Sequence, residues 1–110
     1  MKTEYIVVLV TAKDKQEAQK IANGLLKDKL IACANILPGV TSLFWWQGKI
    51  DQAGETLLVM KTQKKLFHKL AKRVQSLHSY TTPEIIALPI LAGSKRYLQW
   101  IDSSVELEPV

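Results

Sequence analysis

The sequence predicts an α+β fold on the strength of three observations. The segment Tyr5–Val10 is an unbroken apolar run rich in β-branched residues, which is typical of a strand buried on both faces. Two later segments, 14–29 and 62–77, carry apolar residues at helical spacing. Strand-like segments lie between and after these helices, so the expected order of elements is β-α-β-β-α-β, followed by a short C-terminal helix.

The first helix is expected over residues 14–29. Asp14 is followed three residues later by Glu17, which resembles a capping box at a helix N-terminus. Lys27 and Lys29 lie where a positive charge interacts favourably with the C-terminal end of the helix dipole. The apolar stripe that would face the core consists of Ala18, Ile21, Ala22, Leu25 and Leu26.

A long strand and a hairpin are expected next. β-branched and aromatic residues dominate residues 31–46 on both sides of an interruption at Pro38-Gly39, which predicts one kinked strand. A turn must then lead to a strand over 56–61. Two segments can supply it: Gln47-Gly48, because Gly tolerates a positive φ, and residues 51–54, as a bulge or a longer loop.

The C-terminal half contributes a helix with one basic side, a strand and a last helix. Thr62 is expected to cap the second helix, whose polar side carries Lys64, Lys65, His68, Lys69 and Lys72. Residues 78–83 are expected to form a polar loop and residues 84–89 the fourth strand. Ser94 can cap the last helix, and the tail from Ser103 is expected either to be irregular or to pair with a neighbour.

The order of these elements predicts a ferredoxin-like domain, in which both crossover helices cover one face of the sheet. The segment Tyr5–Val10 is nevertheless apolar on both faces, and the hairpin adds Leu43, Phe44, Trp45 and Trp46. Adjacent strand residues point to opposite faces, so one tryptophan is expected to pack on the core and the other at a subunit contact. A monomer with such a patch would aggregate, so we expect self-association, although periodicity does not fix the number of subunits.

Length, composition and charge narrow the function classes. A chain of 110 residues, with 47% hydrophobic and 23% charged residues, is expected to form one globular domain over residues 1–110 with its core at about 5–104. The net charge of +5 is enough to attract anions or nucleic acid, but is also common in proteins that bind neither. Cys33 is the single cysteine and residues 1–4 lead straight into a strand-like run, so a cytoplasmic location is expected. No apolar stretch approaches the roughly 18 to 20 residues that cross a bilayer, so no membrane association is expected.

Four spaced motifs follow one another along the chain in a common register. They are the segment Ala32–Ser42, the hairpin Phe44–Lys49, the step Lys61-Thr62 and the loop His78–Glu84. With these motifs the chain resembles the CutA family of divalent-cation tolerance proteins, from about Tyr5 to Ser104. The resemblance implies a ferredoxin-like homotrimer with the architecture of the PII signalling proteins, a cytoplasmic location in bacteria, and a link to heavy-metal tolerance, especially to copper.

The resemblance also implies a metal site, which this sequence matches only in part. Some members associated with copper carry a cysteine near the end of the first strand and two adjacent histidines before a Pro-Tyr loop. Val10 and Leu77 occupy two of those positions here, and only His78 remains. The resemblance therefore points to a site at His78, with Cys33 and Glu84 as its partners.

Thiolate, imidazole and carboxylate are donor types that copper accepts, and such a site favours Cu(II), with other divalent cations as alternatives. The spacing has no CxxC or HxxxH regularity, so only folding or trimer assembly could bring the three residues together. Each residue also has a structural alternative. Cys33 can be a buried strand residue, His78 can interact with the C-terminal dipole of its helix, and Glu84 can pair with Lys61 or Arg73.

No enzyme is predicted, because the sequence has no Ser-His-Asp order, P-loop, GxGxxG motif or zinc-ligand pair. The basic side of the second helix is interpreted as solvated rather than as a nucleic-acid surface, since it lacks interleaved aromatic residues. Two functions remain. The first is a trimeric metal-binding protein of copper tolerance, and the second is a PII-like sensor that binds a small anionic metabolite in clefts between subunits.

Overall fold

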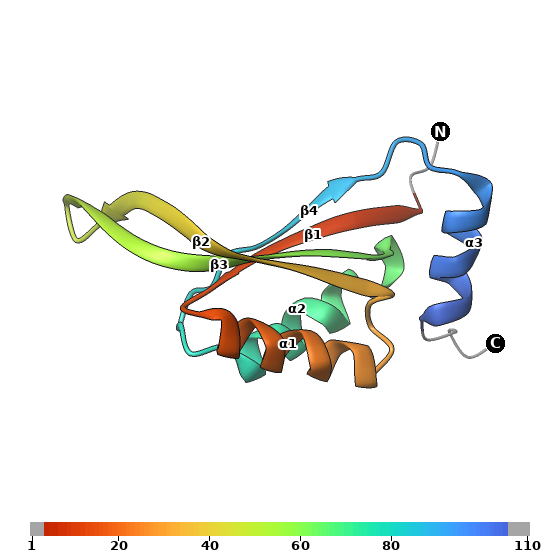
Figure 1. The fold of residues 1–110 in the computed structure, drawn as a ribbon, viewed down its shortest axis with the longest axis horizontal. Coiled ribbons are helices and arrows are strands. Elements are labelled where there is room, and N and C mark those ends of the chain that lie inside the picture. The colour runs from red at the N-terminus through yellow and green to blue at the C-terminus, as the bar shows by residue number, and fades with distance from the viewer. Residues whose placement is uncertain (1–3, 106–110) are drawn as a thin grey trace.

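The computed structural model describes residues 4–105 (Figure 1). Its elements are β1 (Tyr5–Ala12), α1 (Lys15–Lys27), β2 (Cys33–Trp46), β3 (Lys49–Gln63), the 3-10 turn η1 (Lys64–Leu66), α2 (Phe67–Leu77), β4 (Ile85–Pro89) and α3 (Lys95–Ser104). The four strands form one antiparallel sheet in the order β2-β3-β1-β4. The predicted α+β class and the predicted order of elements are therefore confirmed. The predicted irregular tail was expected to begin at Ser103, but Ser103 and Ser104 belong to α3. The rest of this tail, beyond Val105, lies outside the described residues.

The core lies between one face of the sheet and the two crossover helices. Figure 1 shows α1 and α2 side by side along this face, with α3 across one end of the sheet. Every second residue of β1 points into this core, because side chains alternate across a strand. Fully buried side chains from the sheet and the two helices include Val8, Val10, Ile21, Leu25, Leu58, Met60, Leu70 and Val74.

Side-chain caps begin the first and last helices as predicted. The Oδ1 atom of Asp14 accepts a hydrogen bond from the Glu17 N–H at 2.8 Å. The Ser94 hydroxyl oxygen accepts from the Tyr97 N–H at 3.2 Å. The α3 helix is also tied to the sheet, because the two carboxylate oxygens of Asp102 accept from Tyr5 Oη at 2.8 Å and Gln63 Nε2 at 2.7 Å.

The predicted cap at Thr62 is wrong. Thr62 lies within β3, where it pairs with Ile6 of β1, and its buried hydroxyl donates a hydrogen bond to the Leu30 carbonyl at 2.7 Å. Because the β1 ladder continues to Gln63, the strand runs past the point at which a helix was expected. The chain then enters α2 through η1, and no side-chain hydrogen bond caps either η1 or α2.

The β2–β3 hairpin settles the two alternatives for its turn. Gln47 and Gly48 have φ values of 50° and 78°, and positive φ at both central residues is the geometry of a type I′ turn. Residues 51–54 lie inside β3, which is longer than predicted. The predicted kink in β2 is confirmed as a bulge between Leu37 and Val40, with Gly39 at a φ of 79°. Beyond this bulge the hairpin projects past the ends of the helices (Figure 1).

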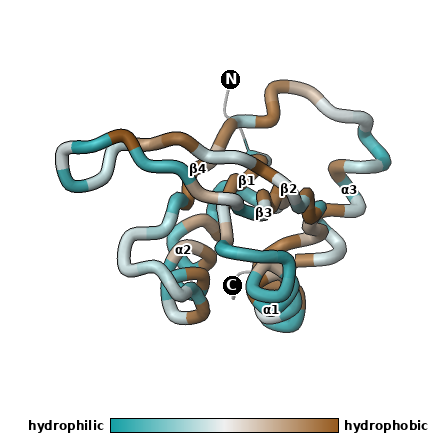
Figure 2. The backbone as a smooth tube through the Cα atoms, turned by 60° about the vertical axis from the view of Figure 1, so that its left-hand side comes forward, coloured by the Kyte–Doolittle hydropathy of each residue, from teal (hydrophilic) through white to brown (hydrophobic). Residues whose placement is uncertain are grey.

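The second face of the sheet, which we call the open face, carries no crossover helix. Residues that pair across the sheet share a face, and rows such as Leu88–Val7–Lys61–Cys33 and Ile86–Leu9–Val59–Asn35 make up this one. Val7, Leu9 and Val59 are half-buried, whereas Leu88 at the sheet edge is 49% exposed. In Figure 2, α1 and α2 carry both hydrophilic and hydrophobic residues, and brown hydrophobic stretches lie along the sheet. No helix within the described residues is long and apolar enough to cross a bilayer.

Both tryptophans of the hairpin are exposed within the single chain. Trp45 is 73% exposed and Trp46 is 58% exposed. The prediction that one of them packs on the core is wrong, since the hairpin carries them past the ends of the helices. Leu43 and Ile50 nearby are also exposed. The hairpin tip is therefore an apolar surface that residues 4–105 do not cover.

Candidate functional site

His78 lies at the C-terminal end of α2, and its imidazole is 0% exposed. The Nδ1 atom accepts a hydrogen bond from the Tyr80 N–H at 3.0 Å. The Nε2 atom lies 2.7 Å from the carbonyl oxygen of Thr11 at the end of β1. Because a carbonyl oxygen only accepts, Nε2 must carry the proton and donate it. Both ring nitrogens are thus engaged, and a metal ion reaches His78 only if one of these hydrogen bonds breaks.

Glu17 is the buried carboxylate beside His78, and together they form what we call the Glu17–His78 cluster. Glu17 Oε1 accepts from the Lys13 N–H at 3.1 Å, and Oε2 accepts from the Ser79 N–H at 3.0 Å. Glu17 Oε1 also lies 3.8 Å from His78 Nδ1. The cluster joins the start of α1 to the loop that follows α2. The sequence indicated Glu17 only as a capping residue, and its contact with Ser79 spans 62 positions of the chain.

Two opposing effects set the protonation of Glu17. Burial, the largest single influence, raises the pKa of this carboxyl group. The hydrogen bonds from Ser79 and Lys13, together with the nearby His78, outweigh it, so the pKa of Glu17 is lowered from its ordinary value of 4.5. The carboxylate form is therefore the one that the folded protein stabilises.

Tyr80 fixes the same loop to the sheet. Its hydroxyl donates to Glu55 Oε2 at 2.9 Å, and its ring lies against that of His78 with the centroids 4.7 Å apart. Burial and then the hydrogen bond to Glu55 raise the pKa of Tyr80 to about 12. The loop after α2 is thus held by contacts to β1, β3 and α1.

Cys33 is the first residue of β2 and lies at the other end of the sheet. It is a half-buried free thiol whose Sγ lies 3.6 Å from the Tyr97 hydroxyl of α3. The Tyr97 ring in turn lies beside Trp100, with the centroids 5.4 Å apart. The hydrogen bond with Cys33 and then burial raise the pKa of Tyr97 to about 12. The thiol therefore has a structural partner within its own chain.

The single chain does not bring the three predicted metal ligands together. Cys33 is in register with Val7 of β1, and His78 contacts Thr11, four residues further along that strand. At about 3.3 Å per residue, the two contact points are separated by roughly 13 Å along the strand. Glu84 is exposed and precedes the first residue of β4, which pairs with Val10, so it lies at the His78 end of the sheet.

The two cations expected as ion-pair partners of Glu84 have other partners in the structure. Arg73 pairs with Asp28, and Lys61 Nζ donates to Asn35 Oδ1. Within residues 4–105, no group of three or more His, Cys, Asp and Glu side chains is arranged to hold a metal ion. The metal site at His78, Cys33 and Glu84 therefore stays a prediction, and a site built from all three needs side chains from more than one copy of the chain.

These features define the class of the protein. It is a small α+β protein whose four-stranded sheet has one helix-covered face and one open face, with a buried cluster fixing the loop between α2 and β4. The family model of the CutA1 divalent ion tolerance protein matches residues 6–104. The chain belongs to this family.

Individual relatives agree with this assignment. A divalent-cation tolerance protein CutA from Thermus thermophilus is 47% identical over 95 residues, which are 86% of this chain and 92% of that protein. Protein CutA 1, chloroplastic, from Oryza sativa subsp. japonica is 42% identical over 99 residues, which are 90% of this chain but 56% of the rice protein. The chain thus spans about half the length of the rice relative.

The fold of a solved relative is also similar. The structure described as the periplasmic divalent cation tolerance protein CutA from Archaeoglobus fulgidus superimposes with a TM-score of 0.90 and 45% identity. The match covers 93% of this chain and 99% of that one. The names of the Thermus and Archaeoglobus relatives refer to divalent-cation tolerance and not to a reaction.

Proposed function

We propose that the protein acts as a homotrimer of ferredoxin-like subunits in tolerance of, or response to, divalent heavy-metal cations, chiefly copper. The observation that carries this proposal is the large apolar surface formed by the open face and the hairpin tip. Membership of the CutA1 family supports the link to divalent cations. We propose no catalytic activity.

The open face supports self-association on physical grounds. Apolar surface transferred out of water stabilises an assembly by about 25 cal/mol per Å². Contiguous apolar patches of this kind are typical of protein interfaces. The open face and the hairpin tip belong to the same sheet. A second copy of the chain that covers the open face therefore also lies beside the hairpin tip. The number three rests on the family resemblance.

The assembly is tested by light scattering coupled to size-exclusion chromatography. We expect a mass of about three times the 12.4 kDa of the chain. A monodisperse monomer at micromolar concentration would contradict the proposal. A dimer would retain the argument from the open face and reject the number supplied by the family.

The copper part of the proposal assigns His78 as a ligand, with Cys33 or Glu84 of a neighbouring subunit assisting. Because both ring nitrogens of His78 already have hydrogen-bond partners, we expect weak binding. Cu(II) should bind more tightly than Zn(II), since it stands highest in the divalent affinity order. In calorimetric titrations at pH 7, a His78→Ala trimer is expected to bind Cu(II) less tightly than the parent does.

His68→Ala is the matched control, because His68 is the other histidine and is exposed on α2. Its copper affinity is expected to equal that of the parent. If His78→Ala binds as the parent does while His68→Ala binds more weakly, the copper is held at the surface and the proposed site is wrong. Cys33→Ser and Glu84→Gln, titrated in the same way, identify the assisting ligand.

A cytoplasmic location is the last part of the proposal, and the lone cysteine supports it. The names of relatives differ in this respect, since one is called chloroplastic and another periplasmic. Fractionation of the source cells, with an antibody against the chain, tests the location directly.

A further inference from the structure

The ring of His78 holds the loop between α2 and β4, which we call the 79–84 loop. The Nδ1 atom of His78 accepts from the Tyr80 N–H at 3.0 Å, and the Tyr80 ring lies against the imidazole. Nε2 donates to the Thr11 carbonyl oxygen at 2.7 Å, and the imidazole is 0% exposed. A neutral imidazole has one nitrogen that can accept or ligate, and here that nitrogen is already bonded to the loop.

Ligation of a cation through either nitrogen of His78 breaks the bond to Tyr80. If Nδ1 is the ligand, its lone pair is no longer available to the Tyr80 N–H. If Nε2 is the ligand, the neutral ring carries its proton on Nδ1 instead, and two N–H groups then face each other. In that case the Nδ1 proton has Glu17 Oε1 nearby, at 3.8 Å, and metal-ligating histidines usually donate their other N–H to such a carboxylate.

The 79–84 loop is also bound to two carboxylates, but it contributes little to the core. The Ser79 N–H donates to Glu17 Oε2 at 3.0 Å, and the Tyr80 hydroxyl donates to Glu55 Oε2 at 2.9 Å. Within residues 4–105, the buried hydrophobic core contains no residue of this loop. The exposed residues of the loop are Ser79, Thr81, Thr82 and Glu84. A segment with so little buried apolar surface opens locally at a small free-energy cost.

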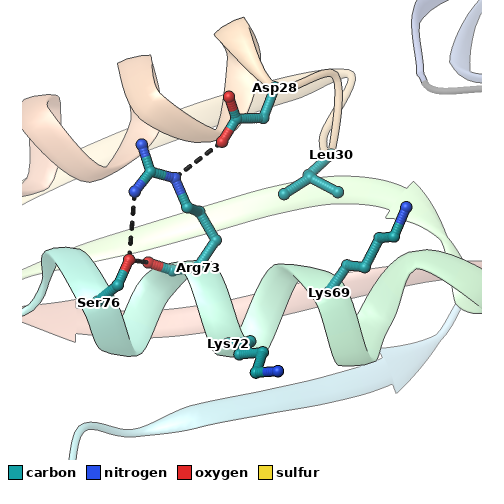
Figure 3. A pocket seen from close by; sticks show the side chains of 6 residues that line it. All are labelled: Asp28, Leu30, Lys69, Lys72, Arg73 and Ser76. Carbon is teal, nitrogen blue, oxygen red and sulfur yellow. Dashed lines mark hydrogen bonds and ion pairs between the residues drawn. The ribbon is translucent and has the colours of Figure 1, made fainter.

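The elements on both sides of the loop are held by separate contacts. Arg73 Nε donates to Asp28 Oδ2 at 2.8 Å, which ties α2 to the end of α1 (Figure 3). A Cβ atom added to Gly24 of α1 would lie 2.8 Å from Leu77 Cδ1, so the last residue of α2 packs closely on α1. On the other side, β4 pairs with β1 from Ile85 onward. The loop can therefore be displaced while both of its ends remain fixed.

We propose that binding of a divalent cation to His78 displaces the 79–84 loop, because the cation and the loop compete for the same imidazole. The inference rests on the proposed metal function and adds a change in the surface of the protein on binding. The observed dissociation constant equals the intrinsic one divided by the fraction of molecules in which the loop is displaced. Any change that weakens the contacts of the loop therefore tightens cation binding.

Amide hydrogen exchange of the full chain, with and without saturating Cu(II), tests the displacement. The Ser79 and Tyr80 N–H groups are hydrogen-bonded and should exchange slowly without copper. With copper bound, we expect their exchange to approach the rate of an unprotected amide, while residues 67–77 of α2 exchange as before. Mass spectrometry of the peptide that contains residues 78–84 measures the change.

Tyr80→Phe is expected to bind Cu(II) more tightly than the parent, although it removes no proposed ligand. The variant loses the hydrogen bond to Glu55, so the loop is displaced more often. The affinity should rise about threefold to tenfold, the factor that corresponds to one hydrogen bond of ordinary strength. Glu55→Gln should act in the same direction with a smaller effect, because an amide oxygen can still accept from Tyr80.

Tyr5→Phe is the matched control, because it also removes a tyrosine hydroxyl that donates to a carboxylate, that of Asp102 at 2.8 Å, at the other end of β1. Its copper affinity is expected to equal that of the parent. Equal tightening in Tyr5→Phe and Tyr80→Phe would overturn the inference, since a general loosening of the fold would explain both.

The outcomes separate this inference from the proposed function. If His78→Ala abolishes copper binding but the exchange of Ser79 and Tyr80 is unchanged or slower with copper bound, the metal function stands and the displacement is wrong. If neither the parent nor Tyr80→Phe binds copper, or if His78→Ala binds it as the parent does, both proposals are wrong.

Discussion

A Leu88→Glu protein is expected to be monomeric at micromolar concentration, where the parent is expected to be a trimer. Leu88 lies in β4 on the open face and is 49% exposed in the single chain. The proposed assembly buries this side chain, and burying an unpaired carboxylate costs several kcal/mol. Every subunit carries the substitution, so the free energy of assembly decreases in magnitude by a multiple of the cost in one subunit. Light scattering at several protein concentrations measures the change.

Leu26→Glu is the control for this substitution. Leu26 is 41% exposed on α1, on the opposite side of the sheet, so the same chemical change is expected to leave the mass of the assembly unaltered. Trp45→Glu at the hairpin tip is expected to act in the same direction as Leu88→Glu. If Leu88→Glu remains a trimer with the stability of the parent, the open face is not the interface.

A Glu17→Gln protein is expected to lose about 2 to 4 kcal/mol of unfolding free energy, because the Lys13 and Ser79 N–H groups lose a carboxylate acceptor. Glutamine offers one acceptor oxygen in place of two, and its NH₂ group faces one of these donors. Urea denaturation at one fixed protein concentration measures the loss, since the stability of an oligomer depends on concentration.

The pH dependence of this loss identifies its cause. The pKa of Glu17 is lowered in the folded protein, so its stabilising contribution is complete above 4.5 and is lost as the pH falls through the folded value. The difference between the parent and Glu17→Gln should therefore be constant above that pH and shrink below it. Glu84→Gln removes an exposed carboxylate from the neighbouring loop and should change the stability by less than about 0.5 kcal/mol. A difference that persists unchanged at low pH would show that the ionised carboxylate is not what stabilises the loop.

Local chemistry explains which parts of the fold could be predicted from the sequence. The caps at Asp14 and Ser94 depend on residues three positions apart, so the sequence contains both partners. The second half of the capping box does not form, because the Glu17 carboxylate accepts from the Lys13 and Ser79 N–H groups. The turn at Gln47-Gly48 depends on two adjacent residues that accept a positive φ. The end of β3 depends instead on pairing with β1, and the Thr62 cap was wrong because that pairing is not visible locally.

The candidate site was less predictable, because its contacts also join residues that are distant in the sequence. The Glu17–His78 cluster joins a helix start, a helix end and a strand end that are distant in the chain. The position of His78 after the last apolar residue of a helix suggested a metal ligand or a partner of the helix dipole. Neither hypothesis predicts that both ring nitrogens of His78 bond to backbone groups, of Thr11 and Tyr80. The basic side of α2 was correctly expected to be solvated, since Lys64, Lys65, His68, Lys69 and Lys72 are all exposed.

The bulge in β2 decides which face each aromatic residue of the hairpin occupies. Leu37 pairs with Leu57 and Val40 with Glu55, so β2 contains one residue more than β3 across this step. The alternation of side chains in β2 is thereby reversed. Beyond it, Phe44 and Trp46 continue the open face, whereas Leu43, Trp45 and Ile50 lie on the opposite side, past the end of the helices. Without the extra residue the two tryptophans would exchange sides. A hairpin that is apolar on both sides cannot be covered by one flat partner, and it fits an arrangement in which it is inserted between two neighbours, as a closed ring of subunits allows.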